Sequence, residues 1–263
     1  MLGAIIGDIV GSVYEFNNYR KKDFDPFFHP EAFFTDDTVC TVAVADALIN
    51  GKDPAVSLRQ WGRRYWDNGG WGQRFALWIA SDDMGPYNSF GNGSAMRVSA
   101  AGLLAKSIAE AVSISDRVTE VTHNHPEGML GAAATAVAIH LARTGSSVVE
   151  IRGEITDQFG YDLTQTVDQI RPGYRYSERC QDTVPQALVC ALEAVDFEDA
   201  IRNAISIGGD SDTIAAIAGA VAEARFGIGE EMAARAWGFL PQDMRGVLTA
   251  LYESAGVGGA GRV

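Results

Sequence analysis

The sequence predicts an all-α fold, a compact bundle of many helices in a single domain. Apolar residues recur at helical spacing through most of the 263 residues. Helix-start signals recur as well, such as Asp53 before Pro54. Alternating strand patterns are nearly absent, and the best of them, residues 146–151, is weak. Because no linker-like segment interrupts the chain, we expect residues 1–263 to form one domain with a frayed tail over about residues 255–263.

The composition restricts the class of function. The chain has 34 acidic against 21 basic residues and a formal net charge of -13, so we expect neither nonspecific nucleic-acid binding nor binding to anionic membranes. Cys40, Cys180 and Cys190 fit no metal-ligand spacing and favour a reduced, cytoplasmic setting. Asp8 interrupts the apolar N-terminus, which does not resemble a signal peptide, and no apolar run reaches the roughly 18 residues of a membrane span. We expect a cytoplasmic monomer.

The first predicted helix covers residues 1–16 and is apolar on nearly all sides. Glycine recurs at every fourth position from Gly3 to Gly11, a spacing that lets another backbone approach closely. The acids of this segment are Asp8 and Glu15, seven residues apart. That separation is about two helical turns, so we expect both on one helix face. Acids on such an apolar helix indicate a functional role or a polar network.

Two clusters of acid and hydroxyl side chains stand where predicted helices begin. The first is Thr-Asp-Asp-Thr at residues 35–38, and the second is Gly-Gly-Asp-Ser-Asp-Thr at residues 208–213. A helix cap accounts for one oxygen in each cluster. It does not account for neighbouring carboxylates, which repel each other unless a cation or a proton intervenes. Oxygen ligands suit magnesium, calcium or manganese, so the pair of clusters predicts a two-ion site.

Between the clusters the chain continues as helices and polar turns. A helix runs from residue 53 to about residue 65, and a short one covers residues 75–79. The glycine-rich segment 87–97 then opens a helix. Its backbone N–H groups could bind a phosphate, and an ordinary tight turn is the alternative interpretation. It matches neither the P-loop nor the dinucleotide fingerprint.

A second polar turn, residues 122–126, follows two helical stretches in residues 100–121 and precedes another helix. His123 and His125 lie too far from other soft ligands in the sequence to favour zinc. We expect them to bond a ligand or the backbone, and we expect His140 to be structural. Further helices are expected over residues 147–159, 163–170, 197–207, 230–237 and 242–254, with one that Asp182 caps and with Asp196 and Asp199 forming a capping box.

Five segments together resemble the ADP-ribosylglycohydrolases, the superfamily of the dinitrogenase reductase-activating glycohydrolase. In chain order they are GDIVGSVYE at 7–15, TDDT at 35–38, GNGSAMR at 91–97, THNHP at 122–126 and GGDSDT at 208–213. Each is weak alone, but the set is specific in combination and order. The resemblance implies an all-α fold with a binuclear Mg²⁺ or Mn²⁺ site in a central cleft.

The resemblance also implies roles for individual residues. The implied metal ligands are Thr35, Asp36, Asp37, Asp210, Asp212 and Thr213, with Asp212 as the bridge. The implied substrate-binding residues, which would hold pyrophosphate and ribose, are Asn92, Gly93, Ser94, Met96 and His123. Tyr87 and Phe90 would face the adenosine. Glu15, Asp36 and Asp212 are the candidate catalytic residues.

The implied activity is hydrolysis of the glycosidic bond at ribose C1″ in ADP-ribosyl conjugates, with release of ADP-ribose. Its partner would be the ADP-ribose group of a modified protein or small molecule. The acceptor could be arginine, serine, a nucleic-acid base or an acetyl ester. Cleavage would pass through an oxocarbenium-like state. The alternatives are a catalytically silent ADP-ribose-binding or toxin-neutralising protein, and a two-metal phosphoester hydrolase.

Overall fold

Helices make up the regular structure of this chain, as the sequence predicts. The computed structural model describes residues 1–257, and within that range it has fourteen α-helices, two 3₁₀ turns and no β-strand. The α-helices are α1 (Leu2–Gly11), α2 (Asp36–Asn50), α3 (Pro54–Arg64), α4 (Gln73–Ala80), α5 (Ser99–Leu104), α6 (Ile108–Thr119), α7 (Pro126–Arg143), α8 (Val148–Phe159), α9 (Val167–Ile170), α10 (Cys180–Glu193), α11 (Phe197–Ser206), α12 (Ser211–Phe226), α13 (Glu230–Phe239) and α14 (Gln242–Ala255). The 3₁₀ turns are η1 (Trp66–Asn68) and η2 (Asn92–Ser94). The predicted all-α fold class is confirmed.

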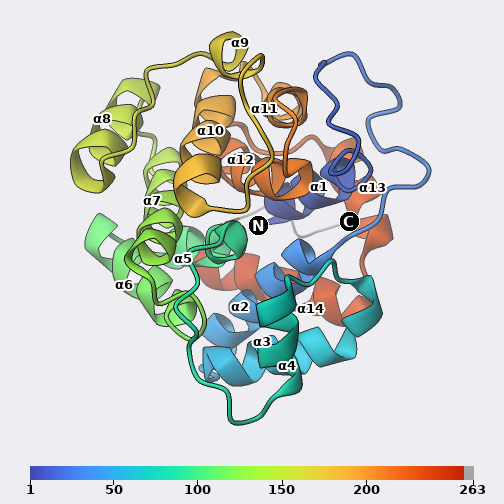
Figure 1. Ribbon diagram of the computed structural model, residues 1–263, viewed down its shortest axis with the longest axis vertical. Coiled ribbons are helices and arrows are strands. Elements are labelled where there is room, and N and C mark those ends of the chain that lie inside the picture. Colours follow the sequence, from blue (N-terminus) through green and yellow to red (C-terminus); the bar gives the residue numbers. More distant parts are fainter. Residues whose placement is uncertain (258–263) are drawn as a thin grey trace.

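Two helices at the centre of the molecule, α1 and α12, pack backbone to backbone (Figure 1). Every residue of α1 is buried. A Cβ on Gly7 would lie 2.0 Å from the carbonyl oxygen of Ala215, and one on Gly11 would lie 2.4 Å from the Cα of Asp212. The regularly spaced glycines therefore admit a neighbouring backbone, as their spacing predicts, and they place the end of α1 against the start of α12.

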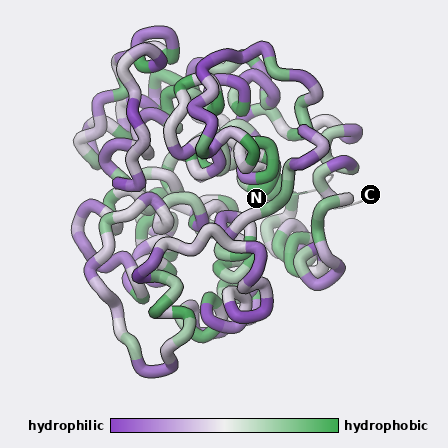
Figure 2. The backbone as a smooth tube through the Cα atoms, turned by 45° about the vertical axis from the view of Figure 1, so that its right-hand side comes forward, coloured by the Kyte–Doolittle hydropathy of each residue, from purple (hydrophilic) through white to green (hydrophobic). Residues whose placement is uncertain are grey.

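Helix α1 also joins the two groups of helices that lie on either side of the central pair (Figure 1). α7, α10 and α11 pack against α12, whereas α3, α5 and α14 pack against α2. α1 contacts both α12 and α2. Figure 2 shows hydrophobic stretches gathered around this N-terminal helix and hydrophilic ones along the outer loops. α1 therefore helps to set the position of α2 relative to α12.

Several helix starts lie where their capping residues predict them. The side chains of Thr35, Asp53 and Asp196 each accept a hydrogen bond from a backbone N–H in the first turn of the helix that they precede. Such a cap stabilises a helix by about 1 kcal/mol. Pro54 occupies the first position of α3, where its missing N–H leaves no donor unpaired. Local capping chemistry therefore sets these boundaries.

The first helix is shorter than predicted. It ends at Gly11 rather than at residue 16, and turns follow over residues 12–18. The chain leaves the core over these turns: Val13 and Tyr14 are only partly buried, and Phe16 is 84% exposed. The expectation that Asp8 and Glu15 share a helix face was therefore wrong. Asp8 belongs to α1, and Glu15 lies in the turns beyond it.

Two later helices also differ from their predicted starts. Asp182 does not cap α10 but lies inside its first turn. The helix starts earlier because the N–H of Cys180 finds a partner in another loop, the carbonyl of Phe90 at 3.0 Å. α9 has only four residues, since the capping box of Thr166 and Gln169 starts it there. His140 is structural as expected: its ring, which is buried, bonds the carbonyl oxygen of Ala105 through Nδ1 at 3.1 Å.

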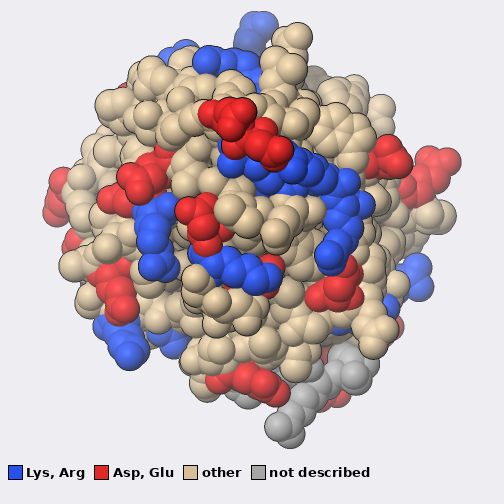
Figure 3. All heavy atoms as spheres, turned by 90° about the horizontal axis from the view of Figure 1, so that it is seen from below, with Lys and Arg blue, Asp and Glu red and all other residues tan. Residues whose placement is uncertain are grey.

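The outer surface and the chain end complete the fold. Over residues 1–257, no helix is both long enough and apolar enough to cross a lipid bilayer. On the face shown in Figure 3, acidic and basic side chains are interspersed rather than separated by sign. Of the tail expected from about residue 255, Ala255 is the last residue of α14, and residues 258–263 lie outside the described range.

The contact between α1 and α12 can be tested with matched glycine substitutions. We expect Gly7→Ala to lower the free energy of unfolding by about 1–3 kcal/mol, because the added Cβ would force the two backbones apart. Gly153 is the control, since it lies in the middle of α8 with open space around it. Gly153→Ala should raise stability by about 0.5–1 kcal/mol. Urea unfolding measures both, and equal effects would contradict the close contact.

Candidate active site

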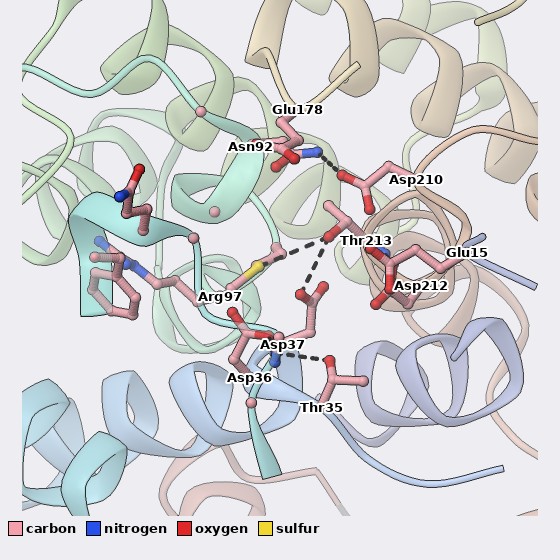
Figure 4. A pocket seen from close by; sticks show the side chains of 18 of the residues that line it. Glu15, Thr35, Asp36, Asp37, Asn92, Arg97, Glu178, Asp210, Asp212 and Thr213 are labelled. Atoms are coloured by element: carbon pink, nitrogen blue, oxygen red, sulfur yellow. Dashed lines mark hydrogen bonds between the residues drawn. The ribbon is translucent and has the colours of Figure 1, made fainter. Parts of the chain in front are cut away.

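A cavity of about 740 Å³ opens beside the junction of α1, α2 and α12. Its walls come from the starts of α2 and α12, the segment 67–75, the glycine-rich segment 87–97 and the loop before α10. Acidic and hydroxyl side chains face each other across it (Figure 4). The cavity therefore collects the motifs that lie far apart in the sequence.

One wall carries the acids at the start of α12. Carboxylate oxygens of Glu15, Asp210 and Asp212 all lie within 4.8 Å of one another. Gly208 and Gly209 precede them with φ of +72° and +79°, a conformation that favours glycine and turns the chain into α12. Glu15, a candidate catalytic residue from the resemblance, lies with the carboxylates of α12 although it belongs to the turns after α1.

The facing wall carries the acids at the start of α2. Asp36 accepts a hydrogen bond from the N–H of Gly70 at 3.0 Å, and Asp37 accepts one from the hydroxyl of Thr213 at 3.2 Å. This second bond links the α2 and α12 clusters directly (Figure 4). The other carboxylate oxygen of Asp37, Oδ1, is buried without a hydrogen-bond partner.

The concentration of carboxylates changes their acidity. Burial raises the pKa of Glu15 to about 7, and the neighbouring Asp210 contributes to this rise. Burial also raises the pKa of Asp36 to about 7, with Asp8 as the main neighbouring charge. The pKa values of Asp37 and Asp212 lie well above their ordinary range, again mainly through burial and then through neighbouring carboxylates. Negative charge here needs compensation by protons or by cations.

The donor set fits a hard divalent cation. The side chains on both walls offer oxygen atoms, which magnesium, manganese and calcium prefer. The unpartnered Oδ1 of Asp37 is a buried acceptor of the kind that a cation would satisfy. The six ligand positions expected from the resemblance all line this one cavity, namely Thr35, Asp36, Asp37, Asp210, Asp212 and Thr213.

Four of the five expected substrate-binding residues line the cavity. Asn92, Gly93, Met96 and His123 line it, and so does Tyr87. The side-chain amide of Asn92 also donates to Asp210 at 2.6 Å, so the glycine-rich segment is tied to the start of α12.

Ser94 and Phe90 do not line the cavity. The buried hydroxyl of Ser94 bonds the carbonyl oxygens of Gly91 at 3.1 Å and Gly128 at 2.9 Å, and so anchors the glycine-rich segment from behind. The ring of Phe90 lies 5.1 Å from that of His125 between centroids. The segment contains η2 and leads to α5, which begins only at residue 99.

His123 presents a nitrogen to the glycine-rich segment. Burial holds its pKa well below the usual range, so the ring is neutral at physiological pH. Thr122 accepts a hydrogen bond from Arg97 at 2.6 Å and lies 2.8 Å from Nδ1 of His123. With the Thr122 hydroxyl donating to Nδ1, all three groups are paired and the ring proton sits on Nε2. Nε2 faces Gly93, where an anionic ligand could accept its hydrogen bond.

The structure adds residues that the sequence did not single out. Tyr176 and Glu178 reach the cavity from the loop before α10, and the hydroxyl of Tyr176 lies 3.3 Å from a carboxylate oxygen of Glu15 and 3.2 Å from one of Glu178. Arg97 is fully buried beside the cavity over the ring of Phe75. The loop has no periodicity that would have marked it, whereas Arg97 closes a segment already recognised.

Fold, cavity and family comparison together define this protein as a glycohydrolase. The model of the ADP-ribosylglycohydrolase family matches residues 1–254, so the chain belongs to that family. The resemblance found in the sequence and the expectation of an enzyme are both confirmed.

Relatives and solved structures agree with this assignment. The ADP-ribosylhydrolase ARH3 of Homo sapiens is 26% identical, over 87% of this chain and 84% of the relative. The ADP-ribosylarginine hydrolase Tri1 of Pseudomonas putida is 28% identical, over 87% of this chain and 70% of the relative. A solved structure titled an ADP-ribosylglycohydrolase-related protein complex has the same fold, with a TM-score of 0.72, 24% identity and 97% coverage of both chains.

The raised pKa values predict how pH acts on cation binding. In the folded protein the pKa values of Glu15 and Asp36 are about 7, whereas an unfolded carboxyl group has a pKa of about 4. Protonation of these two groups therefore stabilises the metal-free fold, and this contribution is complete below about pH 4. That contribution is lost as pH rises through 7. Cations bind the deprotonated groups, so we expect the difference in Tm between Mg²⁺-containing and metal-stripped samples to grow from pH 5.5 to pH 8.

Differential scanning calorimetry at constant ionic strength measures this difference. Asp212→Asn serves as the comparison, because removing one buried carboxylate should shrink the Mg²⁺-dependent rise in Tm at every pH. A rise in Tm that is the same at pH 5.5 and pH 8 would contradict the interpretation.

Proposed function

We propose that this protein hydrolyses the bond between ribose C1″ and the acceptor atom of ADP-ribosyl conjugates and releases free ADP-ribose. One observation carries the proposal: the oxygens of Glu15, Asp210 and Asp212 gather within 4.8 Å, in the same cavity as the glycine-rich segment. The family of the chain and its similarity to the ADP-ribosylhydrolase ARH3 and the ADP-ribosylarginine hydrolase Tri1 support it.

The proposal includes two divalent cations, Mg²⁺ or Mn²⁺. Thr35, Asp36 and Asp37 from one wall and Asp210, Asp212 and Thr213 from the other would hold them, with Asp212 shared. When bound, such cations supply positive charge to the ribose hydroxyls and make a water molecule more acidic. The link between Thr213 and Asp37 supports a shared site, because it brings the two walls within hydrogen-bond distance.

The glycine-rich segment and His123 would bind the ADP portion. The Nε2–H of His123, which lies beside Gly93, would donate to a pyrophosphate oxygen. Met96, which lines the cavity beside Thr213, would contact the ribose. Tyr87 offers an aromatic face for the adenosine, whereas Ser94 would act by holding the segment in place.

Glu15 is the best placed group for proton transfer. It lies half-buried at the cavity wall, outside the proposed ligand set, and the hydroxyl of Tyr176 lies 3.3 Å from its carboxylate. Cleavage breaks the C1″–acceptor bond as Glu15 gives its proton to the leaving atom, and the water that attacks C1″ returns a proton to Glu15. Asp36 is the other candidate, but one of its oxygens is occupied by the N–H of Gly70. Asp212 would contribute mainly through the cations.

The cavity mouth favours a cationic acceptor. Glu15 and Glu178 both bond the exposed Tyr176, so their carboxylates converge at the rim. Phe16 and Phe33, also lining the cavity, are 84% and 51% exposed. Acidic and aromatic groups together suit a guanidinium. We therefore propose ADP-ribosyl-arginine as the preferred conjugate, in keeping with the similarity to the ADP-ribosylarginine hydrolase Tri1.

A panel of conjugates tests the activity and the acceptor. The protein is incubated with Mg²⁺ or Mn²⁺ and with ADP-ribose linked to arginine, serine, a nucleic-acid base or acetate, and free ADP-ribose is quantified. We expect release from the arginine conjugate at the highest kcat/KM. Release of inorganic phosphate instead would indicate a phosphoester hydrolase. Binding of ADP-ribose without turnover of any conjugate would indicate a binding protein.

Two neighbouring glutamates separate proton transfer from acceptor recognition. We expect Glu15→Gln to lower kcat about 10²–10⁴-fold, the usual contribution of a general acid or base. Glu178 bonds the same tyrosine hydroxyl but lies outside the group of Glu15, Asp210 and Asp212, so Glu178→Gln is the matched control. It should raise KM for the arginine conjugate with little change in kcat. Equal losses of kcat in both variants would remove the distinct role of Glu15.

A further inference from the structure

We propose that Asp8 is a positioning residue for the candidate metal centre, which sets the place of the α2 ligands relative to those of α12. The inference rests on the metal centre proposed above. Asp8 is 0% exposed, belongs to α1 and does not line the cavity. It therefore acts through other residues rather than by touching substrate or cation.

The residues that donate hydrogen bonds to the side-chain carboxylate of Asp8, Thr35 and Thr38, belong to the turn that opens α2. Its Oδ2 accepts from the N–H of Thr35 at 2.9 Å and from that of Thr38 at 3.1 Å. The hydroxyl of Thr35 donates to Oδ1 at 2.7 Å, and the hydroxyl of Thr38 donates to Oδ2. These donors bracket Asp36 and Asp37. One buried carboxylate therefore fixes the backbone on both sides of the paired acids.

Asp8 also sets the direction in which Thr35 offers its oxygen. The hydroxyl proton of Thr35 goes to Asp8, and its oxygen accepts the N–H of Asp37 at 3.3 Å. The remaining lone pair is free to face the cavity, which Thr35 lines. A hydroxyl held in this way can act only as an electron-pair donor toward a ligand. Groups behind a ligand that orient it in this manner commonly change metal affinity 10–100-fold.

The position of Asp8 along α1 connects it to the opposite wall. The preceding residue, Gly7, lies against Ala215 of α12, and Gly11 lies against Asp212. Asp8 thus extends a rigid contact with α12 to the start of α2. An asparagine in its place would keep the shape but present an amide N–H₂ to N–H and O–H donors, so part of the turn would lose its acceptor.

Mn²⁺ binding to the metal-stripped protein, measured by electron paramagnetic resonance at neutral pH, tests this role. We expect Asp8→Asn to weaken Mn²⁺ binding about 10–100-fold while kcat at saturating Mn²⁺ stays within about threefold of the wild type. Asp46→Asn is the matched control, since Asp46 is also a buried carboxylate bound to donors near α2, including Lys52 and the ring N–H of Trp61. It should lower Tm and leave Mn²⁺ affinity unchanged.

Thr38→Val provides a milder test should Asp8→Asn fail to fold. It removes only the hydroxyl donor to Asp8 and should weaken Mn²⁺ binding in the same direction, while the double variant binds no more weakly than Asp8→Asn alone. The role of Asp8 would be overturned, but not the metal centre, if folded Asp8→Asn or Thr38→Val bound Mn²⁺ with wild-type affinity. The same conclusion would follow if Asp46→Asn lost as much Mn²⁺ affinity as Asp8→Asn. Absence of Mn²⁺ binding by the wild type would overturn the metal centre and the role of Asp8 together.

Discussion

Repulsion among buried carboxylates is the constraint on which this structure depends. Glu15, Asp36, Asp37, Asp210 and Asp212 share one cavity, and burial raises the pKa of each. Such an arrangement opposes folding unless protons or cations neutralise it. The surrounding helices hold these carboxylates close to one another through apolar packing. The instability of the site and the cation binding proposed for it thus have the same origin.

The apolar helix α1 is the means by which the fold withstands that repulsion. It is buried along its whole length and meets α12 through glycines, so its position has little freedom. Its one acid, Asp8, faces α2 rather than the cavity. The two halves of the cleft come from helices that differ widely in sequence position, and α1 is packed against both. The backbone contact between α1 and α12 therefore makes the cleft rigid, and the carboxylate of Asp8 orients the start of α2.

Local chemistry could be predicted from the sequence, whereas the meeting of loops could not. A cap such as Thr35 acts within one helical turn, so neighbouring residues are enough to recognise it. Adjacent acids repel each other wherever they lie in the fold, so the sequence alone indicates that they need a cation or a proton. Tyr176 and Glu178 have no local signal, because their place depends on a backbone hydrogen bond from Asn92 to the carbonyl of Glu178 at 2.7 Å. Ser94 belongs to a recognised motif, but motif membership does not say which way a side chain points. The end of α1 depended on where the core stops.

The hydrogen bond between Thr213 and Asp37 has a consequence for the kinetics of the protein. It joins the two walls of the cleft through protein groups, so folding itself brings the walls into register. The conformational entropy lost in bringing them together is then part of folding and not of ligand binding. Entry of an ion would be limited by the loss of its own hydration water, which is slow for magnesium, rather than by closure of the protein around it.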